Sequence, residues 1–256
     1  MLAILSPAKS IEEQGISNFE IGNSDLEFKK ETDELISILK EFSVDELSKL
    51  MKMSEKLAIL NYDRYRNFYN DDVKKYTAIL AFKGEAYRGL NAKDFTEEDL
   101  LHSEKVLRVL SGLYGVINPL DIIKEYRLEM GTKLKTSKGK DLYTFWDDKI
   151  TERIEKDIEK SYGDKVLINL ASKEYSSSIN MDRIKLKYDV INISFLENKE
   201  GKYKLIGTYA KKARGMMARY IIKNRIETTE QIKDFDEEGY FFNEQLSDEE
   251  NYVFTR

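Results

Sequence analysis

Short apolar runs and amphipathic segments alternate along the chain, a pattern typical of a mixed sheet covered by helices. An apolar run at residues 2–5 ends in Ser6-Pro7, and another at 166–170 ends in Ala171-Ser172. Both predict buried strands that open into loops. Further strands are expected over residues 76–82, 190–195, 203–209, 239–242 and 252–254, with a hairpin turn at 198–201.

Capping residues predict where the helices begin. Ser43 and Glu46 have the spacing of a capping box, and Thr96 precedes three acidic residues that favour a helix N-terminus. These two helices should run to about residues 52 and 110. Others are expected over residues 54–69, 118–129, 147–160 and 211–224. With two prolines and no linker-like stretch, residues 1–256 are expected to form a single domain of mixed α/β class, a sheet with surrounding helices.

Composition excludes several kinds of chemistry. The chain has no cysteine and one histidine, His102, so disulfides, thiolate nucleophiles and histidine-rich metal centres are excluded. We therefore expect no metal and no other cofactor. The N-terminus lacks the features of a signal peptide, and no apolar run approaches the roughly 18–20 residues that span a bilayer. A cytoplasmic protein with no membrane partner is expected.

Charge is distributed unevenly. The net charge is -5, yet residues 201–226 contain no acidic residue and eight basic ones. Segregated positive charge is what a polyanion-binding surface requires. The eight are Lys202, Lys204, Lys211, Lys212, Arg214, Arg219, Lys223 and Arg225.

Helical geometry divides this basic stretch. In the helix expected over 211–224, Lys212, Arg219 and Lys223 fall within about 20° of one line, and an apolar stripe lies elsewhere on the wheel. One interpretation is a cationic face that binds phosphates. The other is an ordinary amphipathic helix whose cations meet acids elsewhere in the chain.

A break between two expected helices, Leu110–Gly115, contains Gly112, Tyr114 and Gly115. It is similar to the turn of a helix-hairpin-helix element, whose exposed amides bind a DNA phosphate without reading sequence. Tyr114 adds one residue to the usual glycine-apolar-glycine core. The alternative is a glycine that ends one helix before the next begins.

Two loops that leave predicted strands carry polar side chains. One contains Ser6, Lys9 and Ser10, and the other contains Ser172 and Tyr175. Ligands of open α/β sheets bind at the carboxyl ends of strands, so these serines and Tyr175 form a candidate ligand site. Neither loop has the glycine-bearing spacing of a Walker sequence. The alternative is that they are plain connecting loops.

Cations next to aromatics and glycines form a further pattern. Lys83 and Arg88 flank Tyr87, and Arg127 follows Tyr126. Such groups suit phosphate contact and base stacking, and they also suit buried hydrogen-bonded packing. The residue types alone leave both interpretations open.

Seven stretches in one collinear order resemble the YaaA family of bacterial peroxide stress-response proteins. They are LAILSPAKS, AFKGEAYRGL, VLSGLYGVINPLDIIKEYRLEMG, GKDLYTFW, INLASKEY, YAKKARGMMARYII and GYFFNE. The resemblance implies the mixed α/β "cantaloupe" fold with a positively charged cleft and a helix-hairpin-helix element. It also implies resistance to hydrogen peroxide through limiting free iron and Fenton damage.

The resemblance further implies binding to duplex, bubbled and branched DNA without marked sequence preference, with cooperative self-association on the DNA. No catalytic residue transfers from it. By position, the DNA-binding cleft and hairpin are expected to include Lys9, Lys83, Arg88, Gly112, Tyr114, Gly115, Arg127, Lys211, Lys212, Arg214, Arg219 and Lys223.

Two functions are therefore open. The first is a non-enzymatic DNA-binding protein of the peroxide stress response, which docks phosphates in a basic cleft. The second is an enzyme that acts on a nucleotide, a nucleobase or another small phosphorylated ligand in the same cleft. An open basic groove favours the first, and a deep pocket where the serine loops converge favours the second.

Overall fold

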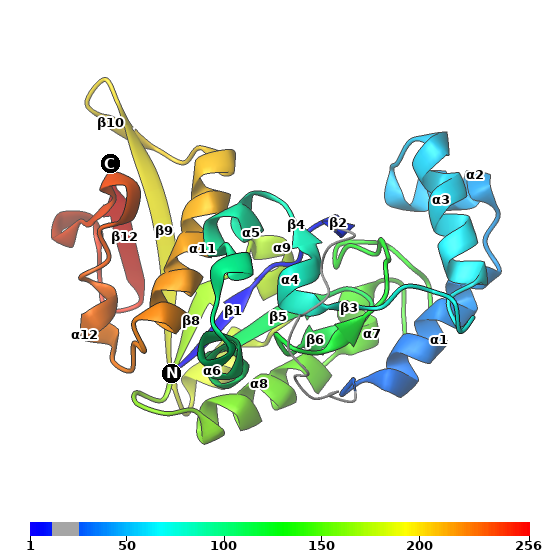
Figure 1. Ribbon diagram of the computed structural model, residues 1–256, viewed down its shortest axis with the longest axis horizontal. Coiled ribbons are helices and arrows are strands. Elements are labelled where there is room, and N and C mark those ends of the chain that lie inside the picture. Colours follow the sequence, from blue (N-terminus) through cyan, green and yellow to red (C-terminus); the bar gives the residue numbers. More distant parts are fainter. Residues whose placement is uncertain (12–25) are drawn as a thin grey trace.

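An eight-stranded sheet forms the centre of the computed structural model, which describes residues 1–11 and 26–256 (Figure 1). Its strand order is β11-β12-β9-β8-β1-β5-β6, and β10 pairs with β9. The strands are β1 (Leu2–Leu5), β5 (Leu107–Ser111), β6 (Gly115–Ile117), β8 (Val166–Leu170), β9 (Asp189–Lys199), β10 (Lys202–Lys204), β11 (Phe241–Phe242) and β12 (Asn251–Thr255). The expected mixed α/β class is confirmed.

Five neighbouring strands, β12, β9, β8, β1 and β5, run parallel, so their carboxyl ends share one edge of the sheet. From β1 the chain goes to β5 on one side, whereas from β8 it goes to β9 on the other. The adjacent ends of β1 and β8 therefore form a topological switch point, where a crevice opens between diverging connections.

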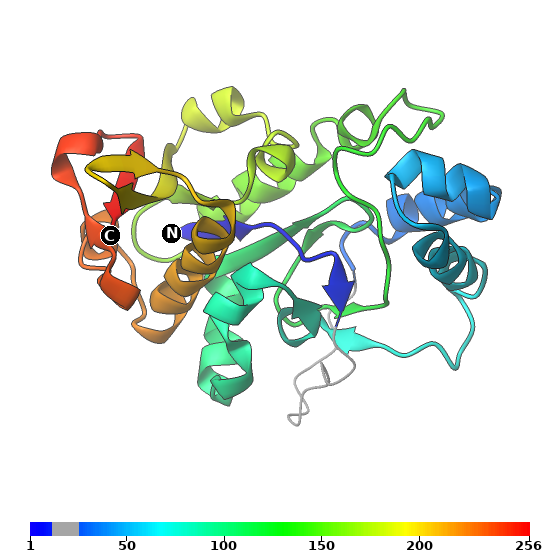
Figure 2. The same ribbon diagram turned by 90° about the horizontal axis from the view of Figure 1, so that it is seen from above.

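Helices cover both faces of this sheet. On one face α11 (Gly207–Lys223) contacts β1, β8 and β9, and α6 (Glu97–Val106) contacts β1 and β5. On the other, α8 (Lys149–Lys160) contacts β6, and α10 (Met181–Lys185) contacts β9. Figure 2 shows the two groups on opposite sides of the strands. The central strand β1 is consequently apolar and buried along its whole length.

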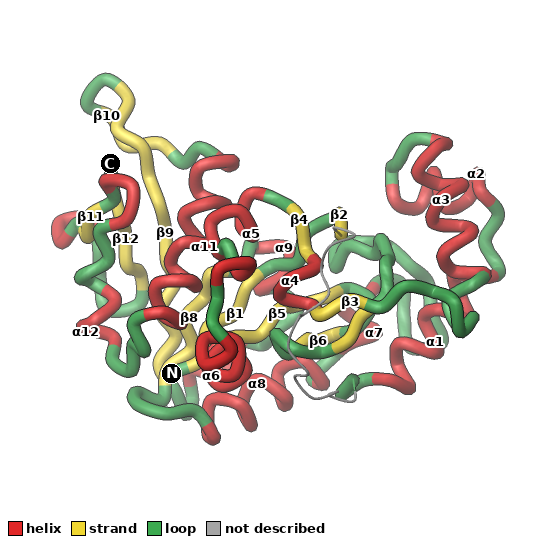
Figure 3. The backbone as a smooth tube through the Cα atoms, viewed as in Figure 1, coloured by secondary structure: helices red, strands yellow, loops and turns green. Residues whose placement is uncertain are grey.

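Three helices form an outlying group: α1 (Lys29–Lys40), α2 (Val44–Met51) and α3 (Glu55–Arg66). Figure 3 shows α2 and α3 at the end of the molecule remote from β11 and β12. Thr32 of α1 donates a hydrogen bond to the Leu113 carbonyl, which ties the group to the sheet.

The remaining strands and α-helices are short. They are β2 (Ser10–Ile11), β3 (Tyr76–Thr77), α4 (Ala78–Ala81), β4 (Phe82–Lys83), α5 (Glu85–Leu90), β7 (Ile122–Ile123), α7 (Leu142–Trp146), α9 (Lys173–Ser176) and α12 (Thr229–Ile232). Four of these strands form two separate two-stranded sheets, in which β2 pairs with β4 and β3 pairs with β7.

The prediction of one strand over 76–82 is wrong, because the chain there forms β3, α4 and β4 in succession. Only the two ends of the segment find strand partners, β7 and β2. Between them, the amides of Ala78 and Ile79 bond the carbonyls of Asp121 and Pro119, and a helical turn follows. Apolar burial alone did not distinguish strand from helix here.

The prediction of two helices on either side of Leu110–Gly115 is also wrong in part. Helix α6 ends at Val106, residues 107–111 form β5, and β6 begins at Gly115, so the turn joins two antiparallel strands. The expected helix-hairpin-helix element is thus a β-hairpin. After it, the Asn118 amide donates to the Asp121 carboxylate at 2.7 Å, as at a helix start, but the Pro119 and Asp121 carbonyls accept the Ile79 and Ala78 amides and no helix follows.

Helices α5 and α11 approach each other closely through two glycines. A Cβ on Gly215 would lie 1.7 Å from the Ala86 carbonyl oxygen, and one on Gly89 would lie 2.0 Å from the Lys212 carbonyl oxygen. No larger residue fits either position without moving a backbone. This contact therefore determines the position of α11 relative to β4 and α5.

No helix in residues 1–11 and 26–256 is long and apolar enough to cross a membrane.

Replacing Gly215 by alanine should separate α5 from α11. We expect Gly215→Ala to lower the free energy of unfolding by about 3 kcal/mol, because the clash involves backbone that cannot rotate away. Chemical denaturation measures this. Gly207→Ala is the matched control, since nothing lies within 4 Å of a Cβ there. The control should change stability by less than about 1 kcal/mol, and equal effects would contradict the interpretation.

Candidate functional site

A cavity of about 320 Å³ lies at the switch point between β1 and β8. The loop after β1 supplies Ser6 and Lys9, and the loop after β8 supplies Ser172 and Tyr175. Its other walls come from residues 83–87 and from α11. The structure thus brings together the two strand-exit loops that the sequence analysis paired.

Four cations line this cavity: Lys9, Lys83, Lys211 and Arg214. Lys9 pairs with Glu129 at 2.8 Å, and its side chain is 62% exposed. Within residues 1–11 and 26–256, no ion pair involves the other three cations. The buried Arg214 Nε has no hydrogen-bond partner among the described residues. Burial lowers the pKa of the Arg214 guanidinium, although an arginine remains charged at neutral pH.

Three carboxylates also line the cavity, and each already has partners. Glu85 accepts a bond from Arg88 at 2.9 Å, Glu129 pairs with Lys9 and Arg127, and Glu174 accepts the Gly131 amide at 2.9 Å. Two of the carboxylates are therefore paired with cations and the third is hydrogen-bonded, whereas three of the four cations have no acidic partner among the described residues. Its balance favours an anionic ligand.

Two serine hydroxyls meet where β1 and β8 end. Ser6 Oγ accepts the Ser172 amide at 2.9 Å and donates to Ser172 Oγ at 3.3 Å. This arrangement leaves the Ser172 hydroxyl proton without an acceptor among the described residues. Tyr87 donates its hydroxyl to the Ser6 carbonyl at 3.1 Å, and burial raises its pKa, so it acts as a neutral hydrogen-bond donor.

The cationic stripe of α11 lies elsewhere and is neutralised. Lys212 pairs with Glu238, Arg219 binds Asp94 in a bidentate pair at 2.6 and 2.9 Å, and Lys223 bonds Asp99 at 2.8 Å. The stripe predicted from the helical wheel exists, but acids distant in sequence cover it. This geometry matches the second interpretation given above, an amphipathic helix whose cations meet acids from other segments.

The remaining predicted residues do not line this cavity. Arg88 pairs with Glu85 and lines a neighbouring cavity of about 480 Å³. Arg127 pairs with Glu129 at 3.3 Å, and Ser10 lies in β2 opposite Lys83. Gly112, Tyr114 and Gly115 are enclosed: Tyr114 is 2% exposed, and its amide bonds Ser111 Oγ. A Cβ on Gly112 would meet the Leu128 carbonyl, and one on Gly115 would meet Trp146.

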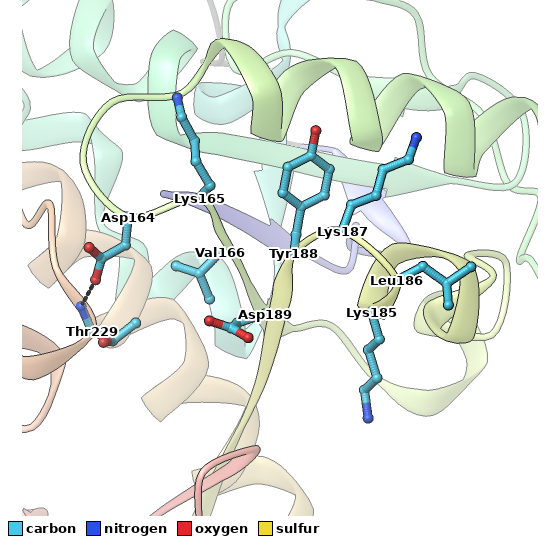
Figure 4. Close-up of a pocket in the computed structure, with 9 residues that line it drawn as sticks. All are labelled: Asp164, Lys165, Val166, Lys185, Leu186, Lys187, Tyr188, Asp189 and Thr229. Atoms are coloured by element: carbon cyan, nitrogen blue, oxygen red, sulfur yellow. Dashed lines mark hydrogen bonds between the residues drawn. The ribbon is translucent and has the colours of Figure 1, made fainter.

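A larger cavity, of about 510 Å³, lies at the amino ends of β8 and β9 (Figure 4). Its lysines are already bound: Lys165 to the Glu159 carbonyl, Lys185 to Glu250 and Lys187 to Glu155. Asp164 accepts the Thr229 amide at 2.8 Å. Because two of its three lysines are paired with carboxylates, this cavity offers an anionic ligand less than the one at the switch point.

No group of three or more metal-ligating side chains occurs in the described ranges of the chain. The carboxylates near the cavity are held by lysines, arginines and amides as described above. The arrangement can bind and orient an anion, and nothing in its geometry marks a metal centre.

Comparison with known proteins identifies the family. A sequence model described as "Peroxide stress protein YaaA" matches residues 1–246. The chain belongs to the YaaA peroxide stress protein family. Two Clostridium perfringens proteins named UPF0246 are each 48% identical to it over the full length of both chains. A UPF0246 protein of Saccharophagus degradans is 44% identical over all of this chain and 99% of its own.

All the residues that line the cavity fall within the part that matches the YaaA family model. Sequence reasoning missed Glu129 and Thr208, which also line it. Neither carries a local signal, because Glu129 arrives from a loop and Thr208 from the first turn of α11. From the residues alone, only the strand-exit loops could be assigned to the site in advance, whereas Lys83, Lys211 and Arg214 were expected there from the family resemblance.

Asp99 anchors the end of the α11 stripe and is 4% exposed. Burial would raise the pKa of its carboxyl, but hydrogen bonds from Lys223, the Thr96 amide and Arg225 outweigh burial and hold that pKa well below its usual range. The folded protein therefore binds this proton less readily than the unfolded chain does. Its contribution to stability is present above the unfolded pKa of about 3.9 and is lost as the pH falls below that value.

We expect Asp99→Asn to lower the free energy of unfolding at pH 7 by about 1–3 kcal/mol, because charge-assisted bonds to three donors are weakened. The difference from wild type should shrink as the pH is lowered below about 4. Urea denaturation at pH 7 and pH 3.5 measures both values. Glu98→Gln removes an exposed charge from the same turn and should change stability by less than about 1 kcal/mol. A pH-independent deficit for Asp99→Asn would contradict the assignment.

Proposed function

We propose that this protein binds DNA without sequence specificity and acts in the peroxide stress response by limiting iron-dependent damage to the bound DNA. The observation that carries the proposal is the convergence of Lys83, Lys211 and Arg214, which no described acid neutralises, at the carboxyl edge of the sheet. Lysine and arginine without local partners attract phosphate and release its counterions on binding.

A second basic element projects from the same edge. Strand β9 continues past Asn192, its last partner for β8, to Lys199, and the hairpin returns through β10 (Figure 1). Lys202, Tyr203 and Lys204 are all exposed, and Tyr203 is 43% exposed. Because β8 and β9 are parallel, the hairpin stands on the side of the sheet where the cavity opens.

The two basic elements support a division of contacts. A duplex cannot enter a cavity of about 320 Å³, so backbone phosphates would meet the cations at its mouth. The hairpin lysines would contact phosphates further along the strand, and Tyr203 offers a ring to an unpaired base. Such contacts fix position on the backbone and carry no sequence information.

The cations at the cavity mouth should determine affinity. We expect Lys83→Ala with Lys211→Ala to weaken binding to duplex and bubbled DNA about tenfold near 0.1 M salt. The slope of log affinity against log salt should fall by about two. Fluorescence anisotropy over a salt series, with DNA of several sequences, measures both values.

Lys156→Ala with Lys160→Ala is the matched control, because it removes the same charge from exposed positions of α8 away from the cavity. This pair should leave the slope nearly unchanged. Equal losses in both double variants would show that net charge alone matters, and an undiminished affinity in the cavity variant would refute the proposed site.

A further inference from the structure

The cavity at the switch point is too small and too enclosed to admit a DNA duplex. Its volume of about 320 Å³ is near the lower end of the roughly 300–1,000 Å³ that ligand pockets span. Leu5, Pro7, Leu170, Tyr87 and Tyr175 supply apolar and aromatic lining. Tyr87 and Tyr175 are 7% and 8% exposed, so these rings are held rigidly in place.

The charge of the cavity matches a dianion. Lys83, Lys211 and Arg214 have no described acidic partner, whereas Glu85, Glu129 and Glu174 are each engaged by other groups. A phosphodiester carries one negative charge, and a terminal phosphomonoester carries between one and a half and two near neutral pH. Three cations at one small site therefore suit the monoester better.

The hydrogen-bond donors of the cavity also suit a phosphomonoester. Arginine donates several N–H bonds in a planar fork that matches phosphate oxygens, and the buried Arg214 Nε lacks any described partner. The Ser172 hydroxyl proton likewise has no acceptor among the described residues, because Ser6 is the donor in the bond between the two hydroxyls. A phosphate in the cavity would accept bonds from the Ser172 hydroxyl and from the terminal N–H groups of Arg214, which bond no other described residue.

We propose that this cavity binds a 5′-phosphorylated nucleotide, with the phosphomonoester on Lys83, Lys211 and Arg214 and the nucleoside along the aromatic lining. The nucleotide is either free or the 5′-terminal residue of a DNA strand. The second source rests on the proposed DNA binding, whereas the first does not. Either way the site is a distinct pocket within the larger basic surface.

The experiment uses the whole protein and five probes. Thermal shift and calorimetry compare deoxyadenosine 5′-monophosphate, deoxyadenosine and inorganic phosphate. Anisotropy then compares one single-stranded oligonucleotide carrying a 5′-phosphate or a 5′-hydroxyl. We expect the mononucleotide to bind and the nucleoside to bind at least tenfold more weakly, since charge-assisted phosphate bonds are lost.

Variants locate the effect. Arg214→Gln should weaken mononucleotide binding about tenfold or more. Because Arg214 is partly buried, Lys211→Ala serves as a second variant at an exposed position, and circular dichroism confirms that each is folded. Lys156→Ala is the control and should bind the mononucleotide like wild type.

The outcomes separate the two sources and the two proposals. A preference for the 5′-phosphorylated oligonucleotide that Lys211→Ala abolishes supports the DNA end as the ligand. Mononucleotide binding without that preference supports a free nucleotide, even if duplex binding is absent and DNA binding fails. Intact DNA binding with no mononucleotide binding and no effect of the 5′-phosphate overturns the cavity proposal alone.

Discussion

The contact between α5 and α11 is the constraint on which the basic site depends. At Gly89 and Gly215 two backbones touch, and neither position has space for a Cβ. Lys83 precedes α5, and Lys211 and Arg214 lie on the first half of α11. The glycine contact therefore sets the distance between cations from two distant segments, which would otherwise repel one another.

Electrostatic balance explains why only part of the basic stretch is available to a ligand. Residues 201–226 lack acids in sequence, but the fold brings Asp94, Asp99 and Glu238 against the stripe of α11. Cations one or two turns away, at the amino-terminal part of the helix, face the cavity. Lys212 is paired although it lies between Lys211 and Arg214, so the face of the helix on which a cation lies decides whether it pairs with an acid or remains free for a phosphate.

Local signals made part of this structure predictable. The buried strands β1 and β8 were recognisable because helices cover both faces of the sheet, and the caps at Ser43 and Thr96 form the expected reciprocal bonds. The error over 118–129 has a physical cause: Asn118-Pro119 has the composition of a helix start, but the Pro119 and Asp121 carbonyls are taken by the Ile79 and Ala78 amides of a distant segment. Likewise, no local pattern pairs Arg219 with Asp94, which lies 125 residues away. The strand-exit loops were predictable because their place follows from the strands, whereas Glu129 and Thr208 depend on tertiary packing.

Strand β1 has a consequence for how the molecule assembles. It lies between β5 and β8, so Ala3 pairs with Leu107, and Leu2 pairs with Leu167. Contacts of such long sequence separation close large loops, which slows folding. The cavity, whose walls are the ends of β1 and β8, can appear only after those loops have closed. A partly folded chain would have most of its helices and no site, so ligand binding reports completion of the central sheet.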